Sequence, residues 1–139
     1  MWGWKHKKLA VALTCADWRL HQHKVDLNRR LATLLGVEGV DFIAVPGPDG
    51  LTRPERSSEW QTAVSQVNLL IAAHAPRVLV VAAHQRCAGH PVPDVEHETD
   101  VLATAKALKA ATGFFGPVCA VVAVYHSDTR WELKPVGQF

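Results

Sequence analysis

Short apolar runs alternate with amphipathic stretches along this chain, and the alternation predicts strands separated by helices. A continuous apolar run of this length is typical of a strand that is buried on both faces. The runs lie at residues 9–14, 40–45, 78–83 and 118–125. Residues 131–136 are a candidate for a short fifth strand at the C-terminus.

Apolar residues recur at helical spacing between these runs. Residues 27–35 follow this spacing, and Gly36 provides a stop. The clearest amphipathic helix follows Ser58 and Gln61, whose types and spacing form a capping box, and Pro76 ends it. A weaker pattern predicts a helix over residues 96–111 with Gly113 as its stop. The inward face of the clearest helix is expected to comprise Trp60, Ala63, Val64, Val67, Leu70, Ile71 and His74.

Strands that alternate with helices pair in parallel through crossover connections. The sequence therefore predicts an α/β fold with a mainly parallel four-stranded sheet flanked by helices, besides the short fifth strand. The length of 139 residues suits a single domain over residues 1–139. Ligands of such sheets bind beyond the carboxyl ends of the strands, so residues 15–19 and 84–87 are the first candidates for a site.

Composition and charge limit the kinds of molecule that this chain is expected to bind. Hydrophobic residues make up 48% of the chain and the formal net charge is +2, which indicates a globular domain with a mixed surface. No stretch resembles a nucleic-acid-binding face or a membrane span, and the apolar run after Lys8 is too short for a signal peptide. A cytoplasmic location is therefore expected. The three cysteines fit reduced thiols or metal ligands better than disulfides.

The first and third predicted strands are each followed by a polar segment that contains cysteine. Cys15, Asp17 and Arg19 alternate, so an extended backbone would place them on one face. His84 and Cys87 are three positions apart, a spacing that lets a turn bring both onto one ion. Two thiolates and an imidazole suit zinc, and three protein ligands leave a fourth position open, as at catalytic zinc sites. The two segments thus favour a metal site.

Other interpretations of the same residues stay open. Cys119, inside the fourth predicted strand, is typical of a core cysteine. Asp17 and Arg19 could form a surface ion pair of little energetic weight. Cys15 with His84 could be the nucleophile and base of a hydrolase. The chain has no C-x-x-C pair or glycine-rich phosphate loop, and Cys15 and Arg19 are too close in sequence for a phosphatase loop.

Residues 15–19, Cys-Ala-Asp-Trp-Arg, resemble the C-x-D-x-R motif of β-class carbonic anhydrases, and residues 84–87, His-Gln-Arg-Cys, resemble their H-x-x-C motif. The resemblance extends from about residue 9 to residue 136. It implies a zinc ion held by Cys15, His84 and Cys87, with Arg19 keeping Asp17 off the metal. Asp17 would accept a hydrogen bond from the zinc-bound water. It further implies a zinc lyase that hydrates carbon dioxide reversibly to bicarbonate, working as a homodimer or larger homo-oligomer.

The chain departs from the family pattern in the loop at residues 46–50, where the family usually has Arg-Asn-Ala-Gly, and at Ala88. Two alternatives follow: a hydrolase of carbonyl sulfide or carbon disulfide on the same scaffold, and a zinc-binding but catalytically silent relative. His90 is expected at the rim of the cleft, with a proton shuttle as its alternative role, and His126 is a candidate for the same cleft. Aromatic residues favour interfaces, so the candidates for one are Trp2, Trp4 and Trp18.

Overall fold

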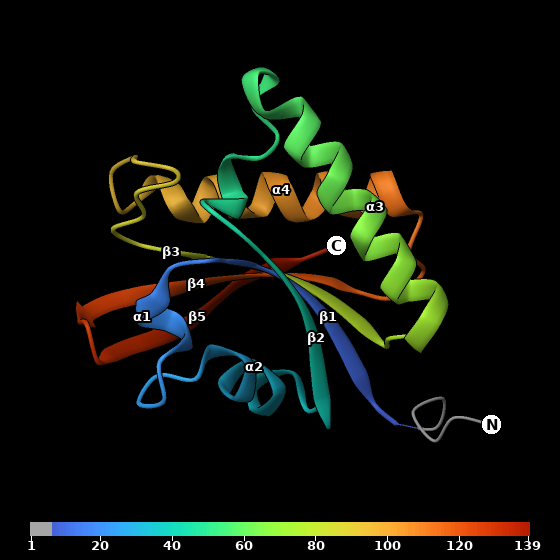
Figure 1. Cartoon of the computed structure of the whole chain (residues 1–139), viewed down its shortest axis with the longest axis horizontal. Coiled ribbons are helices and arrows are strands. Elements are labelled where there is room, and N and C mark those ends of the chain that lie inside the picture. The colour runs from blue at the N-terminus through green and yellow to red at the C-terminus, as the bar shows by residue number, and fades with distance from the viewer. Residues whose placement is uncertain (1–6) are drawn as a thin grey trace.

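The computed structural model describes residues 7–139, and a five-stranded sheet lies at its centre (Figure 1). The strand order is β2-β1-β3-β4-β5. Neighbours from β2 to β4 pair in parallel, and β5 returns antiparallel beside β4. The strands are β1 (Leu9–Cys15), β2 (Gly39–Val45), β3 (Val78–His84), β4 (Val118–Ser127) and β5 (Arg130–Gln138). The α/β class is confirmed, and the fifth strand is longer than the sequence pattern predicted.

Helices cover both faces of the sheet. Helices α3 and α4 lie on one face, and α2 lies on the other (Figure 1). Within residues 7–139, no helix combines the length and apolar character that crossing a membrane requires. The helices are α1 (Trp18–His21), α2 (Leu27–Leu35), α3 (Ser57–His74) and α4 (Glu96–Thr112), with short 3-10 turns η2 (Pro48–Gly50) and η3 (Pro54–Arg56).

Two hydrophobic cores explain why the central strand β3 is apolar at nearly every position. In β3, Leu79 and Val81 belong to the core beneath α3 and α4, whereas Val80 and Ala82 belong to the core beside α2. Successive side chains of a strand point to opposite faces, so a strand covered on both faces needs an apolar residue at nearly every position. All seven residues of β3 are buried.

The start of α3 differs from the prediction. The helix begins at Ser57, directly after η3, and no side chain caps its first turn, so the predicted capping box is wrong. Arg56 occupies the cap position, and its guanidinium donates to the Gly47 carbonyl at 2.8 Å. The predicted inward face is correct, because Ala63 and Val67 are buried. The stops are also correct at Gly36 and Gly113, which have φ of 66° and 63°.

The topology places the ends of β1 and β3 together. The chain passes from β1 to β2 on one side of β1 and then to β3 on the other side. Such a reversal of strand order opens a crevice at the carboxyl ends of the two central strands. Thr14 lies opposite Ala82 across this pair, so Cys15 and the segment after β3 meet at the same edge of the sheet.

Candidate metal centre

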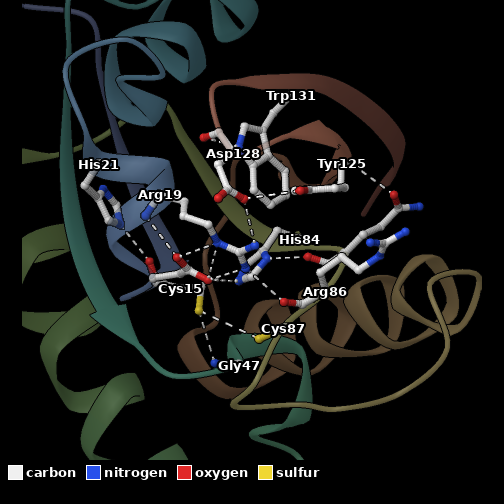
Figure 2. Close-up of polar contacts among 12 residues, drawn as sticks. Cys15, Arg19, His21, Gly47, His84, Arg86, Cys87, Tyr125, Asp128 and Trp131 are labelled. Atoms are coloured by element: carbon white, nitrogen blue, oxygen red, sulfur yellow. Dashed lines mark hydrogen bonds and ion pairs between the residues drawn. The ribbon is translucent and has the colours of Figure 1, made fainter.

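The structure brings Cys15, His84 and Cys87 together at this edge. All three are buried, and one ligand atom from each lies within 4.8 Å of the others. Cys15 ends β1 and His84 ends β3. Arg86 then adopts φ of 58°, and this left-handed turn returns the chain so that the Cys87 Sγ lies 3.8 Å from the Cys15 Sγ (Figure 2).

The donor set fits a zinc ion. A tetrahedral ion with Zn–S distances of about 2.3 Å separates two sulfur ligands by about 3.8 Å. The Sγ atoms of Cys15 and Cys87 lie 3.8 Å apart, which matches this separation. The Nδ1 of His84 donates to the Gln85 carbonyl at 2.6 Å, which leaves the lone pair on Nε2. That Nε2 is buried and has no hydrogen-bond partner among the described residues. Because unpartnered buried polar atoms are costly, a cation beside the two sulfurs would relieve this one.

The two thiols ionise unequally. A hydrogen bond from the Cys87 thiol is the main cause that lowers the pKa of Cys15 to about 4, against the effect of burial. The same interaction, together with burial, raises the pKa of Cys87 far above its usual range. Burial acts to lower the pKa of His84, but the neighbouring Cys15 thiolate outweighs it and the net direction is upward. The protein alone thus stabilises one thiolate, and a bound cation would be needed to ionise both sulfurs.

Asp17 and Arg19 form a tight pair beside the sulfurs. Asp17 caps α1, where its Oδ1 accepts from the Arg19 backbone N–H at 2.9 Å. The Arg19 Nη2 donates to Asp17 Oδ2 at 2.7 Å, and that same oxygen lies 3.8 Å from the His84 Nε2. The prediction of one extended segment is wrong, because this cap starts a helix at Trp18. The side chains of Asp17 and Arg19 nevertheless meet beside His84.

The Asp17 carboxyl stays ionised because of Arg19. Burial acts to raise its pKa, but the hydrogen bonds from the Arg19 side chain and backbone outweigh burial and hold the pKa below its usual range. Hydrogen bonding to Asp17 in turn raises the pKa of Arg19. The pair therefore holds an ionised carboxylate beside the unpartnered His84 nitrogen.

Sequence reasoning missed the side chains that hold the Arg19 guanidinium. The Trp131 ring lies 5.3 Å from the guanidinium carbon and packs edge to face on His84, with 5.6 Å between ring centroids. The available signal in the sequence was a tryptophan between the charged residues Arg130 and Glu132. Nothing in the sequence shows that the β4–β5 hairpin brings this residue to the site. The residues around the guanidinium are Arg86, Tyr125, Asp128 and Trp131 (Figure 2).

The loop after β2 contacts Cys15. The Gly47 N–H donates to the Cys15 Sγ at 3.4 Å. Gly47 has φ of 55°, and a β carbon there would lie 2.5 Å from the Gly89 carbonyl carbon. Asp49, the carboxylate of this loop, accepts from the His97 Nδ1 at 2.6 Å. The loop at residues 46–50 therefore contributes a backbone N–H to the site, whereas the carboxylate of Asp49 is hydrogen-bonded to His97.

A small cavity opens beside Cys15. Its volume is about 230 Å³, and it is lined by Ala16, Asp17, Pro46 and Ala88 as well as by the cysteine. The alanine and proline side chains make much of its wall apolar, and apolar surface does not favour a charged or strongly hydrated ligand. A small, neutral molecule is compatible with such a wall.

The remaining candidates lie elsewhere. Cys119 is half-buried and packs against the core beside α2, so it is a core residue as predicted, although its thiol is not fully buried. His126 is exposed beside Glu132 and does not join the site. His90 is buried and lies 2.7 Å from Asp100, so it is not at the rim. Trp18 is 67% exposed, and Trp2 and Trp4 lie outside the described residues.

Comparisons with known proteins agree with this fold. The family described as "Putative carbonic anhydrase" matches residues 5–137. No curated protein matches the sequence. The carbonic anhydrase of Streptococcus mutans superposes with a TM-score of 0.62 and 16% identity, over 99% of this chain and 86% of that chain. The b-carbonic anhydrase CafA of Aspergillus fumigatus gives 0.54 and 15%, over 94% and 75%. At these identities the two structures show a shared fold, whereas the family match covers nearly the whole sequence, and the chain therefore belongs to the carbonic anhydrase family.

Proposed function

We propose that this protein is a zinc-dependent carbonic anhydrase that interconverts carbon dioxide and bicarbonate. Cys15, His84 and Cys87 would hold the zinc ion. The observation that carries the proposal is the unpartnered, buried Nε2 of His84 beside two sulfur atoms 3.8 Å apart. Zinc bound there would supply the Lewis acidity that turns water into a nucleophile.

Asp17 and Arg19 would act as a unit in this reaction. An oxygen of the Asp17 carboxylate lies 3.8 Å from the His84 Nε2, close enough to orient a water molecule in the cavity by accepting a hydrogen bond from it. Arg19 holds both carboxylate oxygens of Asp17, with contacts of 3.1 Å and 2.7 Å. Because the guanidinium itself donates to the Arg86 carbonyl at 3.0 Å, it would hold Asp17 away from the metal.

The apolar wall of the cavity supports a neutral, linear substrate. Carbonyl sulfide and carbon disulfide share that shape with carbon dioxide, so hydrolysis of these two molecules is the alternative activity. A zinc-binding but silent protein is the remaining alternative. The engagement of Asp49 by His97 argues against the silent form, because no carboxylate of the altered loop competes for the site.

The protein would act as a single domain over residues 1–139, assembled as a homodimer or larger. The family resemblance supports this assembly, and the exposed Trp18, next to Asp17 in the chain, is consistent with it. Trp side chains are enriched at the centres of protein interfaces.

The test combines zinc content with turnover. Zinc should be present at one equivalent per chain in protein purified without chelator, and the protein should hydrate carbon dioxide in a stopped-flow indicator assay. The Cys15→Ser variant should lose both properties. Cys119→Ser is the matched control, because Cys119 is a half-buried thiol outside the site.

Three results would contradict the proposal in different ways. Protein without zinc, or a Cys15→Ser, Cys87→Ser double variant that retains all its zinc, removes the metal assignment. Zinc-loaded protein that hydrolyses carbonyl sulfide or carbon disulfide but does not hydrate carbon dioxide identifies the alternative substrates. Zinc-loaded protein inactive on all three molecules identifies the silent form.

A further inference from the structure

A second cluster of metal-ligand side chains lies outside the cysteine site and shares no residue with it. One ligand atom each from Asp49, His90 and Asp100 lies within 4.8 Å of the others. The three residues come from η2, from the segment after β3 and from α4. The His90 Nε2 lies 2.7 Å from the Asp100 Oδ2. Three separate parts of the chain therefore converge on one point.

The Asp49 carboxylate of this cluster is only partly paired by hydrogen bonds. The Asp49 side chain is fully buried, and its Oδ2 accepts from the His97 Nδ1 at 2.6 Å. Its other oxygen, Oδ1, has no hydrogen-bond partner among the described residues. A buried carboxylate oxygen without a partner carries a desolvation cost, and buried carboxylates are normally fully paired or bound to a cation. This buried oxygen belongs to a residue of the cluster and is therefore available to a positive group.

We propose that Asp49, His90 and Asp100 bind a second divalent cation of the manganese class. Two carboxylates balance the charge of a dication, and the imidazole of His90 completes a set of oxygen and nitrogen ligands without sulfur. Such harder ligands suit manganese, whereas thiolates select zinc. The two sites of this protein would therefore select different ions.

The surroundings of the cluster support the assignment. The Nδ1 of His97 donates a hydrogen bond to the Asp49 carboxylate, and carboxylates that bind metals commonly accept such hydrogen bonds from neighbouring residues. Thr104 Oγ1 donates to the backbone carbonyls of Asp49 at 3.4 Å and Asp100 at 2.9 Å, and so ties the two ligand segments together. The Asp100 side chain is 30% exposed, which provides a path from solvent.

The ion would also support the cysteine site. It would join η2 to α4 and to the segment after β3, and these are the stretches that hold Gly47 against Gly89. Gly47 in turn donates to the Cys15 Sγ. Stabilisation of the loop by the second ion is therefore expected to raise the melting temperature of the zinc-loaded protein.

The experiment is a titration of zinc-loaded protein with Mn²⁺, in which electron paramagnetic resonance measures the free ion. Wild-type protein should bind one Mn²⁺ per chain. Loss of an outer partner alone weakens metal binding about 10- to 100-fold, so Asp100→Asn, which removes a direct ligand, should weaken it by at least about tenfold. His90→Ala should behave in the same way. The matched control is Asp94→Asn, whose carboxylate lies on the same segment but pairs with Arg86.

Two results would overturn the proposal. Zinc-loaded wild-type protein without saturable Mn²⁺ binding would show that the cluster is only two His–Asp ion pairs. Binding that is equally tight in Asp100→Asn and His90→Ala would place the ion elsewhere. Each variant must show the near-UV circular dichroism of wild type, and the partly exposed Asp100 is the safer of the two. A Cys15→Ser variant should still bind Mn²⁺, so this proposal and the zinc proposal fail independently.

Discussion

The contact between Gly47 and Gly89 leads to a quantitative prediction for Gly47→Ala. Gly47 has φ of 55°, and the added β carbon would meet three backbone atoms of Gly89 and His90 at 2.5 to 2.7 Å. A left-handed conformation costs an L-residue about 1–2 kcal/mol. Overpacking costs about 1–3 kcal/mol more, because backbone atoms cannot rotate away as a flexible side chain would.

The free energy of unfolding should therefore fall by about 2–5 kcal/mol in Gly47→Ala, a large part of the roughly 5–15 kcal/mol typical of a domain. Gly36→Ala is the matched control. Gly36 has φ of 66°, but a β carbon added there would have no neighbouring atom within 4 Å. The Gly36→Ala variant should lose only the free energy that the left-handed conformation costs, about 1–2 kcal/mol. The difference between the two variants isolates the clash.

Urea unfolding at one fixed zinc concentration measures the free energy of unfolding of both variants. The loop carries the Gly47 N–H that donates to the Cys15 Sγ, so zinc affinity should also fall in Gly47→Ala and stay unchanged in Gly36→Ala. If Gly47→Ala is no less stable than Gly36→Ala, the close approach of the two loops is wrong.

Four further predictions concern the Asp17–Arg19 pair, pH and assembly. Arg19→Ala should be nearly inactive, because a freed Asp17 would compete for the open zinc position, while Arg53→Ala, at an exposed arginine outside the site, serves as the control; an undiminished rate would refute this role. Turnover should rise with pH through and above neutrality, because two thiolates offset the charge of the ion and make its water less acidic than the value of about 7 at three-histidine sites; a flat pH profile would contradict this. The pKa of Asp17 lies below its usual value, so the pair stabilises the fold above that value and loses this contribution as pH falls through the folded pKa; unfolding measured against pH should show a steeper acid loss in wild type than in Asp17→Asn. Sedimentation at micromolar concentration should give a dimer or larger, and a monomer mass would count against the assembly.

The sequence alone was sufficient for the positions of the strands, for the C-terminal ends of α2 and α4, and for the residues that meet at the candidate metal centre. Strands buried on both faces must be largely apolar, so β1 and β3 were visible as uninterrupted runs. Parallel pairing then required their carboxyl ends to meet, which placed Cys15 near His84 and Cys87. Left-handed glycines ended α2 and α4 where the sequence indicated, because this conformation strains other residues.

Local features that depend on competing partners were not predictable. Ser58 and Gln61 had the types of a capping box, but η3 preceded the helix and Arg56 took the cap position. Asp17 could have continued an extended strand, yet it capped α1 because its carboxylate could accept the Arg19 N–H. Both outcomes depend on small differences in free energy between alternative local hydrogen bonds.

Only the tertiary structure decided which distant side chains surround the site. Trp131 reaches His84 and Arg19 through an antiparallel hairpin whose register no local pattern specifies. His90, expected at the rim, is buried against Asp100, and Asp49 is buried against His97. Periodicity reports which face of an element is buried, because burial of apolar surface follows a regular spacing. Pairing between polar groups on different elements has no such period, so the second cluster became visible only when the elements were packed together.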